Sequence, residues 1–386
     1  MRRHRYESLA GGTDAPVDDL IDLAHQSVSL AVREMGCRIS TDSGSFTRAA
    51  ANLDRVGQLK LSDETLRQVV EGEGRAVLAW QDQEQLELDF DAGQCVTNAT
   101  EDASVTTRAY VGIDGFMAPM VTDAEKSKRF EKARARRQRL PRRRAVGKAS
   151  VGVRRPPLVR RRGADQRYKE FKLVEIYDQD RRHKLMRVTR HGPDRVGKML
   201  RAMAEDVHLH RAEQLVAVTD GAEWIAGLID RNLPKKKTTV ILDFYHAAEH
   251  VHQTRRTVFG EENAEGKQWA GTLIEGMLQQ PFDTWWDELV KTRGRTRAAT
   301  KRQSLDGLMH YLLKRREKLD YARFRSMGLI IGSGSTESGC KSESRRLKGV
   351  GMRWNAANAE AMMALESLHQ SNLWPTYWQS RLKVAA

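Results

Sequence analysis

Four acidic residues of the chain stand where their side chains could do chemistry together. YVGIDG carries Asp114, QLVAVTD carries Asp220, TTVILD carries Asp243, and a late polar stretch, GSGSTESGCKSESRRLKGVGMRW, carries Glu337. Mg²⁺ prefers carboxylate oxygens as protein ligands. Two such ions about 4 Å apart can activate an attacking oxygen and stabilise a leaving one. Two strand-end aspartates and one helix-borne glutamate therefore suit two-metal phosphoryl transfer with Mg²⁺ or Mn²⁺.

A plainer interpretation of Glu337 is helix capping. Ser335 or Thr336 could cap a helix, and Glu337 would then lie in its first turn, where a negative charge suits the helix dipole. The short stretch fits both interpretations equally. The rest of the chain favours the metal site.

Hydrophobic periodicity predicts the elements that must position these acids. Strands are predicted at residues 107–119 (with its end at Asp114 and Gly115), 168–178, 183–191, 214–220 and 238–246, and helices at 193–210 and 221–233. Three successive strands followed by alternating helices and strands predict an α/β fold with a mixed sheet. Sites in such sheets gather at the carboxyl ends of strands, where the three aspartates are expected.

The remaining chain is predicted to be mostly helical. The expected regions are a helical N-terminal region for DNA binding or dimerisation (1–80), a polar linker (81–107), the first part of a catalytic core (108–250), a helical insertion (251–330), and the second part of the core with C-terminal helices (331–386). Ser62 is the expected cap of one N-terminal helix. Trp269, Trp285 and Trp286 are expected in the core of the insertion.

The charge of the chain indicates a polyanionic partner. The net charge is +15 and the pI is about 9.8, which is typical of nucleic-acid binding. A membrane partner is disfavoured, because no stretch approaches the roughly 18 apolar residues of a spanning helix. The N-terminus also lacks the apolar core of a secretory signal.

One segment concentrates this charge. Residues 126–167 hold eighteen Lys or Arg and only two acids, and they show no hydrophobic periodicity, so we predict a mobile basic arm that contacts phosphates. A second basic group follows Glu337. The predicted DNA contacts are Arg134, Arg136, Arg137, Arg142, Arg143, Arg144, Arg160, Arg161, Arg162, Lys341, Arg345, Arg346, Lys348 and Arg353.

The three cysteines, Cys37, Cys95 and Cys340, are far apart and form no C-x-x-C pair. This spacing argues for a reducing cytoplasm and against both a disulfide framework and a cysteine-based zinc module.

Four motifs together resemble one family. YVGIDGF, VTDGAEWI, ILDFYHAAEH and GSGSTESGCKSESRRLKGVGMRW are similar to motifs of the ISKra-type DDE transposases of bacterial insertion sequences, relatives of Mutator-like elements with a ribonuclease H-like fold. The resemblance covers about residues 13–370. It implies Asp114, Asp220 and Glu337 as catalytic acids and metal ligands, with Asp220 following the fourth strand. Asp243 and His246 match an Asp-x-x-His signature that accompanies the acids.

The resemblance also implies an activity and partners. Such an enzyme cleaves the ends of its element with water and joins the free 3′-hydroxyl to target DNA, using two Mg²⁺ or Mn²⁺ ions. The implied partners are double-stranded element ends and target, bound by a homodimer or higher oligomer in the cytoplasm, at the nucleoid. Two departures are a missing cysteine-rich module before the helices and an unusually long, arginine-rich arm.

Two rival functions stay open at this point. His246 to His250 reads HAAEH, the inverted zinc-peptidase pattern, with Glu249 as its base. The other rival is an inactive or domesticated transposase that only binds DNA. Trp224 is expected in the core, whereas Trp354 could equally pack beneath a helix or touch DNA.

Overall fold

The structure is a computed structural model of residues 1–386, and it describes residues 28–83, 86, 88–97, 107–139 and 158–385. Only the backbone is described for residues 382–385 and for four short strands: β1 (Tyr6–Glu7), β2 (Thr13–Asp14), β4 (Arg144–Val146) and β5 (Ala149–Val151). No helix of this described part is long and apolar enough to cross a membrane.

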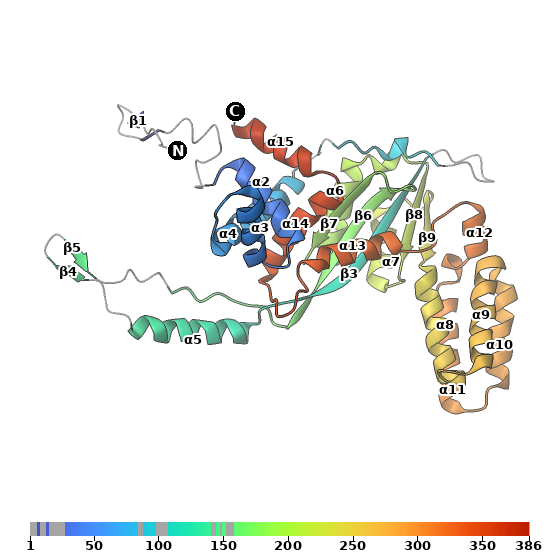
Figure 1. The fold of residues 1–386 in the computed structure, drawn as a ribbon. Coiled ribbons are helices and arrows are strands. Elements are labelled where there is room, and N and C mark those ends of the chain that lie inside the picture. The colour runs from blue at the N-terminus through green and yellow to red at the C-terminus, as the bar shows by residue number, and fades with distance from the viewer. Residues whose placement is uncertain are drawn as a thin grey trace.

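A five-stranded mixed sheet lies at the centre of the molecule (Figure 1). In spatial order its strands are β7 (Lys184–Thr189), β6 (Tyr168–Asp178), β3 (Arg108–Pro119), β8 (Gln214–Thr219) and β9 (Thr238–Leu242). β6 is antiparallel to both of its neighbours, whereas β3, β8 and β9 are parallel. The predicted α/β fold with a mixed sheet is confirmed, and β8 is the fourth of these strands along the chain.

β3 is longer than the sequence predicted. It does not end at Asp114 and Gly115 but continues to Pro119, because β6 pairs with it along its whole length up to the Pro119–Tyr168 pair. The parallel pairing with β8 stops earlier, at Gly112 and Val218. Asp114 therefore lies inside a strand, just beyond the point where one neighbour ends.

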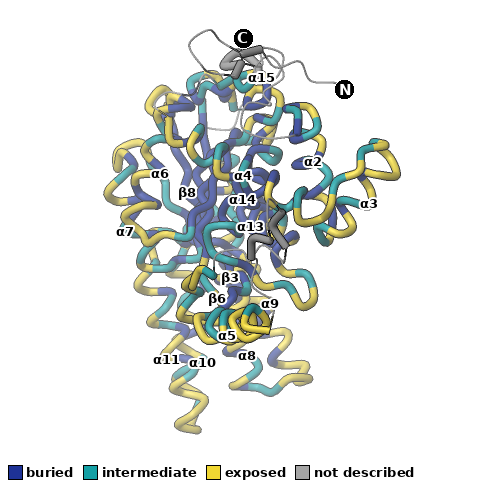
Figure 2. The backbone as a smooth tube through the Cα atoms, turned by 90° about the vertical axis from the view of Figure 1, so that its left-hand side faces the viewer, coloured by how far each residue is buried: buried dark blue, intermediate teal, exposed yellow. Residues whose placement is uncertain are grey.

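Helices cover both faces of the sheet (Figure 2). One face carries α6 (Pro193–Asp206) and α7 (Glu223–Asn232), with the short η2 (Leu209–Arg211) after α6; the other carries α13 (Gly334–Arg345) and α14 (Ala356–Gln370). All six residues of β8 are buried between these layers. The last helix is α15 (Trp374–Ala385).

The N-terminal helices share the core of the sheet and do not form a separate one. They are α2 (Leu30–Asp42), α3 (Phe46–Gly57) and α4 (Asp63–Gln81). The expected cap of α4 is confirmed, since Ser62 Oγ accepts the Thr65 N–H at 3.0 Å. α4 lies so close to α14 that a Cβ on Gly74 would overlap the Ala361 carbonyl oxygen.

The described part of residues 81–107, expected to be a linker, packs onto this same core. Phe90, Ala92 and Cys95 are buried around the short η1 (Ala92–Gln94). The segment is polar overall, but these few apolar side chains are enough to anchor it.

The predicted helical insertion forms a bundle at the far end of β9 (Figure 1). It comprises α8 (Phe244–Phe259), α9 (Ala264–Gln279), α10 (Phe282–Arg295), α11 (Ala299–Leu313), η3 (Arg316–Lys318) and α12 (Tyr321–Ser326). Trp269 and Trp285 are buried in a second core, and Trp286 packs against it, as expected.

The basic segment begins with a helix, α5 (Asp123–Arg139), which projects from the body of the molecule (Figure 1). Sequence analysis missed it, because α5 buries no residue and so leaves no hydrophobic period. Its start is a capping box, in which Thr122 Oγ1 accepts the Glu125 N–H and Glu125 Oε2 accepts the Thr122 N–H. Ala, Lys, Arg and Glu, all strong helix formers, make up most of the rest.

Candidate active site

The register of two parallel strands places Asp114 beside Asp220. Their last pair is Gly112 with Val218, and each aspartate follows two residues later. Both side chains are partly buried. The strands therefore direct two carboxylates to the same edge of the sheet, as the sequence predicted.

Asp114 is held from both sides. Its Oδ1 accepts the Gly115 N–H at 2.6 Å, and its Oδ2 accepts the Cys340 thiol of α13 at 3.4 Å. Burial raises the pKa of Asp114, and the negative charges of Asp220 and Glu337 raise it further. Sequence analysis gave Cys340 no role; its place three residues after Glu337 on a helix was the available signal.

Asp220 is fixed in the turn that follows β8. Its Oδ1 accepts the Ala222 N–H at 2.8 Å. The helical insertion supports this turn, because the Tyr311 hydroxyl donates to the Asp220 carbonyl at 3.4 Å and Arg315 donates to the Gly221 carbonyl at 2.9 Å. In the described part of the chain, the second Asp220 carboxylate oxygen accepts no hydrogen bond.

Glu337 lies in the first turn of α13, as the sequence suggested, but the cap differs. The N-cap residue is Ser333, whereas the expected caps Ser335 and Thr336 are inside the helix and buried. Glu337 is exposed, and its Oε1 accepts the Ser333 hydroxyl at 3.2 Å.

A buried polar contact seats α13 on the sheet. Thr336 Oγ1 donates to Glu175 Oε1 at 2.8 Å, and Glu175, on β6, is fully buried. Burial raises the pKa of Glu175, and hydrogen bonds from Thr336 and Ser335 act against this rise. Glu175 pairs with Gly112 across the sheet, where a Cβ would overlap Thr336 Oγ1. Glycine at 112 thus allows the helix to approach closely.

Asp243 has a different environment from the other aspartates. It is only 1% exposed and caps α8, with Oδ1 accepting the His246 N–H at 2.7 Å and Oδ2 accepting the Ser333 N–H at 2.5 Å. Both oxygens are committed to backbone amides. Asp243 therefore joins the start of α8 to the segment before Glu337, and its hydrogen bond with His246 is to the backbone N–H.

The HAAEH residues lie on α8 without forming a ligand set. The ring centroids of His246 and His250 are 5.0 Å apart, His250 stacks on Tyr311 at 4.0 Å, and Glu249 pairs with Arg256 at 3.2 Å. Across the described residues, no group of three His, Cys, Asp or Glu side chains is gathered closely enough to hold a metal ion.

Asp114, Asp220 and Glu337 are likewise not gathered closely enough to hold a metal ion in this structure. The three are near enough for their charges to act on one another, but Glu337 stays apart at the surface. None of them forms an ion pair with a Lys, Arg or His in the described part of the chain. Uncompensated carboxylates repel one another, and their hard oxygen donors are those that Mg²⁺ or Mn²⁺ takes.

Most of the predicted DNA contacts that can be placed are at the surface. Arg134 and Arg136 on α5, Arg160, Arg161 and Arg162 on the returning chain, and Lys341, Arg345 and Lys348 are exposed, and Arg137 is half-buried. Arg345 also pairs with Asp42 at 3.2 Å, and Arg353 pairs with Glu125. Arg142, Arg143 and the side chain of Arg144 lie outside the described residues.

Arg346 is the exception among them. It is 7% exposed, lies over the rings of Phe46 and Trp354 at 4.8 and 5.3 Å, and donates to the Ser40 carbonyl at 3.0 Å. Burial lowers its pKa to about 10. It joins α2 and α3 to the chain after α13. Trp354 is buried with it and packs in the core.

Comparison with known proteins gives little. No family model and no curated protein matches the chain. Among solved structures, the Drosophila P element transposase strand transfer complex is similar at 12% identity and a TM-score of 0.37, over 92% of this chain and 95% of that chain. Similarity of this size leaves the argument to the site itself.

Trp224, which was expected in the core, is partly buried and packs against the core of the sheet.

Proposed function

We propose that this chain is a DDE transposase of the ISKra type with a ribonuclease H-like catalytic core. The observation that supports it best is the register of β3 and β8, which brings Asp114 and Asp220 to one sheet edge. Glu337 approaches that edge on α13, and its charge acts on Asp114. The position of Asp220 directly after the fourth strand also agrees with the expected topology.

In this proposal each acid has a distinct task. Asp114 and Asp220, fixed by their backbone contacts, present oxygens at set positions. Glu337 is exposed and completes the set by turning its side chain from Ser333 toward the two aspartates. Two bound Mg²⁺ or Mn²⁺ ions would supply activation of the attacking oxygen and stabilisation of the leaving one. Cys340 keeps one oxygen of Asp114 in place as a neutral donor.

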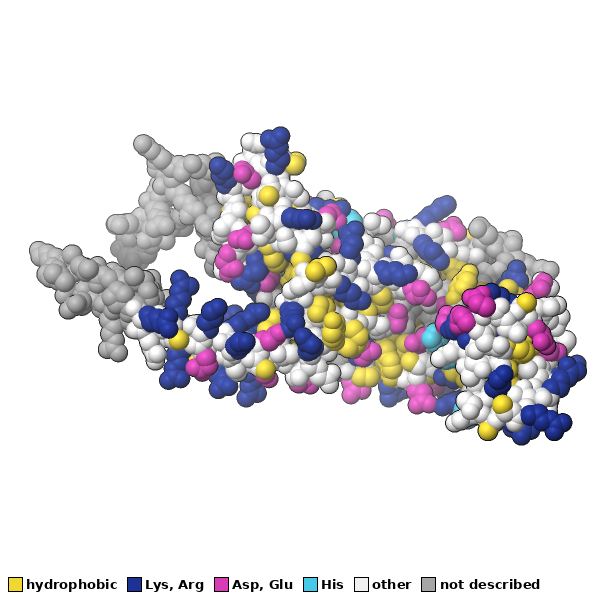
Figure 3. Space-filling model, turned by 60° about the horizontal axis from the view of Figure 1, so that its bottom comes forward, with side chains coloured by type: hydrophobic (Ala, Val, Ile, Leu, Met, Phe, Trp, Pro, Cys, Tyr) yellow, Lys and Arg dark blue, Asp and Glu magenta, His cyan; other side chains and the backbone are white. Residues whose placement is uncertain are grey.

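DNA is the substrate that this site and the surface charge fit together. Lys and Arg side chains crowd the projecting arm in Figure 3, where Figure 1 has α5. α5 follows β3 with only a short connection, so the strand that carries Asp114 leads into the basic helix. Phosphate contacts along this helix would hold DNA close to the acids.

The direct test is strand cleavage by the purified full chain. The substrate is a duplex carrying the terminal repeats that flank the gene, incubated with Mg²⁺ or Mn²⁺ and, in parallel, with EDTA. We expect metal-dependent nicking at the repeat ends, followed by joining of the new 3′-hydroxyl to a second duplex. Binding without nicking under any divalent ion would instead identify an inactive, DNA-binding relative.

A further inference from the structure

A cleft of about 610 Å³ lies between α4, the start of α5 and the chain around Trp354, apart from the three acids. Its lining includes Phe46, Val121 and Trp354 as an apolar part and charged side chains from α4 and from the basic segment. Trp354 pairs with this region through its backbone, since its N–H donates to the Pro119 carbonyl at 3.0 Å.

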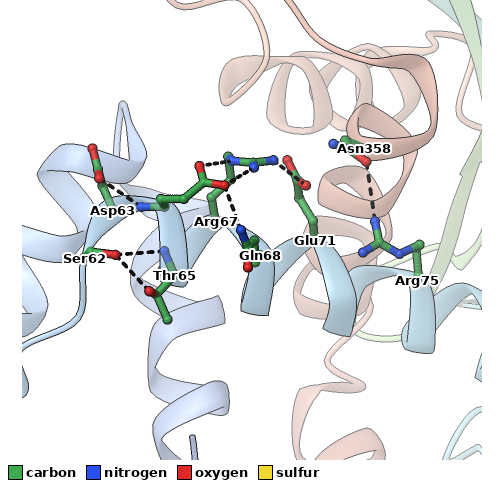
Figure 4. A network of polar contacts seen from close by, with 9 residues as sticks. Ser62, Asp63, Thr65, Arg67, Gln68, Glu71, Arg75 and Asn358 are labelled. Carbon is green, nitrogen blue, oxygen red and sulfur yellow. Dashed lines mark hydrogen bonds and ion pairs between the residues drawn. The ribbon is translucent and has the colours of Figure 1, made fainter. Parts of the chain in front are cut away.

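The α4 wall of the cleft carries three acids, Asp63, Glu64 and Glu71, and one cation, Arg67, and hydrogen bonds join these residues and their neighbours (Figure 4). Arg67 donates to Glu64 at 2.6 Å and to Glu71 at 2.8 Å. The bonds from Arg67 and Gln68 lower the pKa of Glu64 to about 2, so it stays charged and paired. Asp63 accepts the Thr47 hydroxyl at 3.0 Å. The ion pairs of these acids in the described part of the chain are with Arg67 on their own wall, and none is with a cation opposite.

The opposite wall holds cations without such partners. Lys126 and Arg129 come from one side of α5, and Arg161 comes from the chain that returns beside it. None of the three forms an ion pair with an acid in the described ranges. Burial lowers the pKa of Lys126, and the positive charges of Arg129, Arg161 and Arg67 lower it further. The negative charge of Glu71 acts in the opposite direction and raises it.

We propose that this cleft binds the sugar–phosphate backbone of DNA through Lys126, Arg129 and Arg161. Like charges gathered in a partly desolvated cleft are costly until an anion joins them. The inference rests on the proposed function for the choice of DNA. It locates part of the phosphate contact expected of the basic segment in one cleft, and it names Lys126 and Arg129, which are not among the individual DNA contacts predicted from the sequence.

An extended anion fits better than a small one. α5 continues from Lys126 and Arg129 to Lys132 and Arg136, and at 1.5 Å per residue these cations extend over about 15 Å. The cleft also lies near the catalytic edge along the chain: Asp114 and Val121 are seven residues apart, about 23 Å if fully extended. One turn of B-DNA, about 34 Å, would reach both.

The test is DNA binding by fluorescence anisotropy in EDTA, over a series of salt concentrations. The variant is Lys126→Ala/Arg129→Ala in the full chain. Its control is Lys301→Ala/Arg302→Ala, which removes two exposed charges from α11. Two lost phosphate contacts should flatten the slope of log K against log salt by about 1.8. We expect that change in the cleft variant, an almost unchanged slope in the control, and equal melting temperatures.

Three results would overturn the proposal. Equal losses in both variants would show that only total charge matters. An unchanged slope with weaker binding of inorganic pyrophosphate would show a small-anion site. A lower melting temperature with normal DNA binding would show that the cations brace α4. Asp114→Asn separates this proposal from the proposed function, because it should bind DNA normally in EDTA and fail only in cleavage.

Discussion

The contact between Thr336 and Glu175 offers the best-defined perturbation of the site. Thr336→Val keeps the shape of the side chain but removes the hydrogen bond to Oε1 of a fully buried carboxyl group. Leaving such a group without a hydrogen bond costs about 1–3 kcal/mol. Glu337 is the next residue along α13. We therefore expect the loss of the Thr336 contact also to displace the Glu337 side chain.

The substitution should change both the melting temperature and the Mn²⁺ concentration that cleavage requires. Unfolding 386 residues at about 2.1 cal/mol/K per residue gives an entropy near 0.8 kcal/mol/K, so the melting temperature should fall by about 1–4 °C. If about 1–2 kcal/mol of the cost is transferred to the ligand set, half-maximal cleavage should need about 5- to 30-fold more Mn²⁺. The rate at saturating Mn²⁺ should recover, because the ligands themselves remain.

The assay is cleavage of a labelled duplex against Mn²⁺ concentration, with melting curves on the same samples. Glu175→Gln is the matched control, because the amide oxygen can still accept the Thr336 hydroxyl and the side chain is uncharged. It should keep the wild-type metal requirement. A Thr336→Val enzyme with a lower melting temperature and an unchanged metal requirement would refute the reasoning, since the contact would then be structural only.

Three further predictions follow from buried groups near the site. Glu343 is 1% exposed with one oxygen unpartnered, and burial raises its pKa well above the ordinary value. The contribution of its protonated form to stability is thus complete below about pH 4.3 and is lost as the pH rises toward the folded pKa. Glu343→Gln should therefore raise the melting temperature at pH 8 and leave it unchanged at pH 4. Asp243→Asn should lower the melting temperature, because an amide nitrogen cannot accept the Ser333 N–H. Gly112→Ala should cost about 1–3 kcal/mol in chemical denaturation, because its methyl group overlaps Thr336.

The sequence predicted the sheet well because each of its strands leaves a distinct signal. Apolar runs such as QLVAVT are bounded by turn residues, and β8 covers that run. The strand predicted at 238–246 is shorter in the structure, because β9 ends at Leu242 and α8 begins at Phe244. The adjacency of Asp114 and Asp220 was expected from the resemblance to ribonuclease H-like transposases, because chain order alone does not say which strands are neighbours in a sheet. The length of β3 was not predicted, because it depends on pairing with β6, a long-range contact.

The remainder escaped prediction for physical reasons that can be named. α5 has no buried face and therefore no periodicity, although the Thr122–Glu125 capping box was a local signal. Glu175 reads as one charged residue in a strand, and only the approach of α13 makes it a buried partner of Thr336. Arg346 belongs to a basic run by sequence, but its aromatic neighbours come from elements distant in the chain.

The most direct measurement of the central claim compares cleavage rates at saturating Mn²⁺ for Asp220→Asn and Asp243→Asn. Asn at 220 still accepts the Ala222 N–H but loses the charge that binds a hard cation. We predict a loss of several orders of magnitude for Asp220→Asn with normal folding. We predict a loss of about 10- to 100-fold for Asp243→Asn, whose oxygens hold backbone amides. Near-normal cleavage by Asp220→Asn would contradict the account.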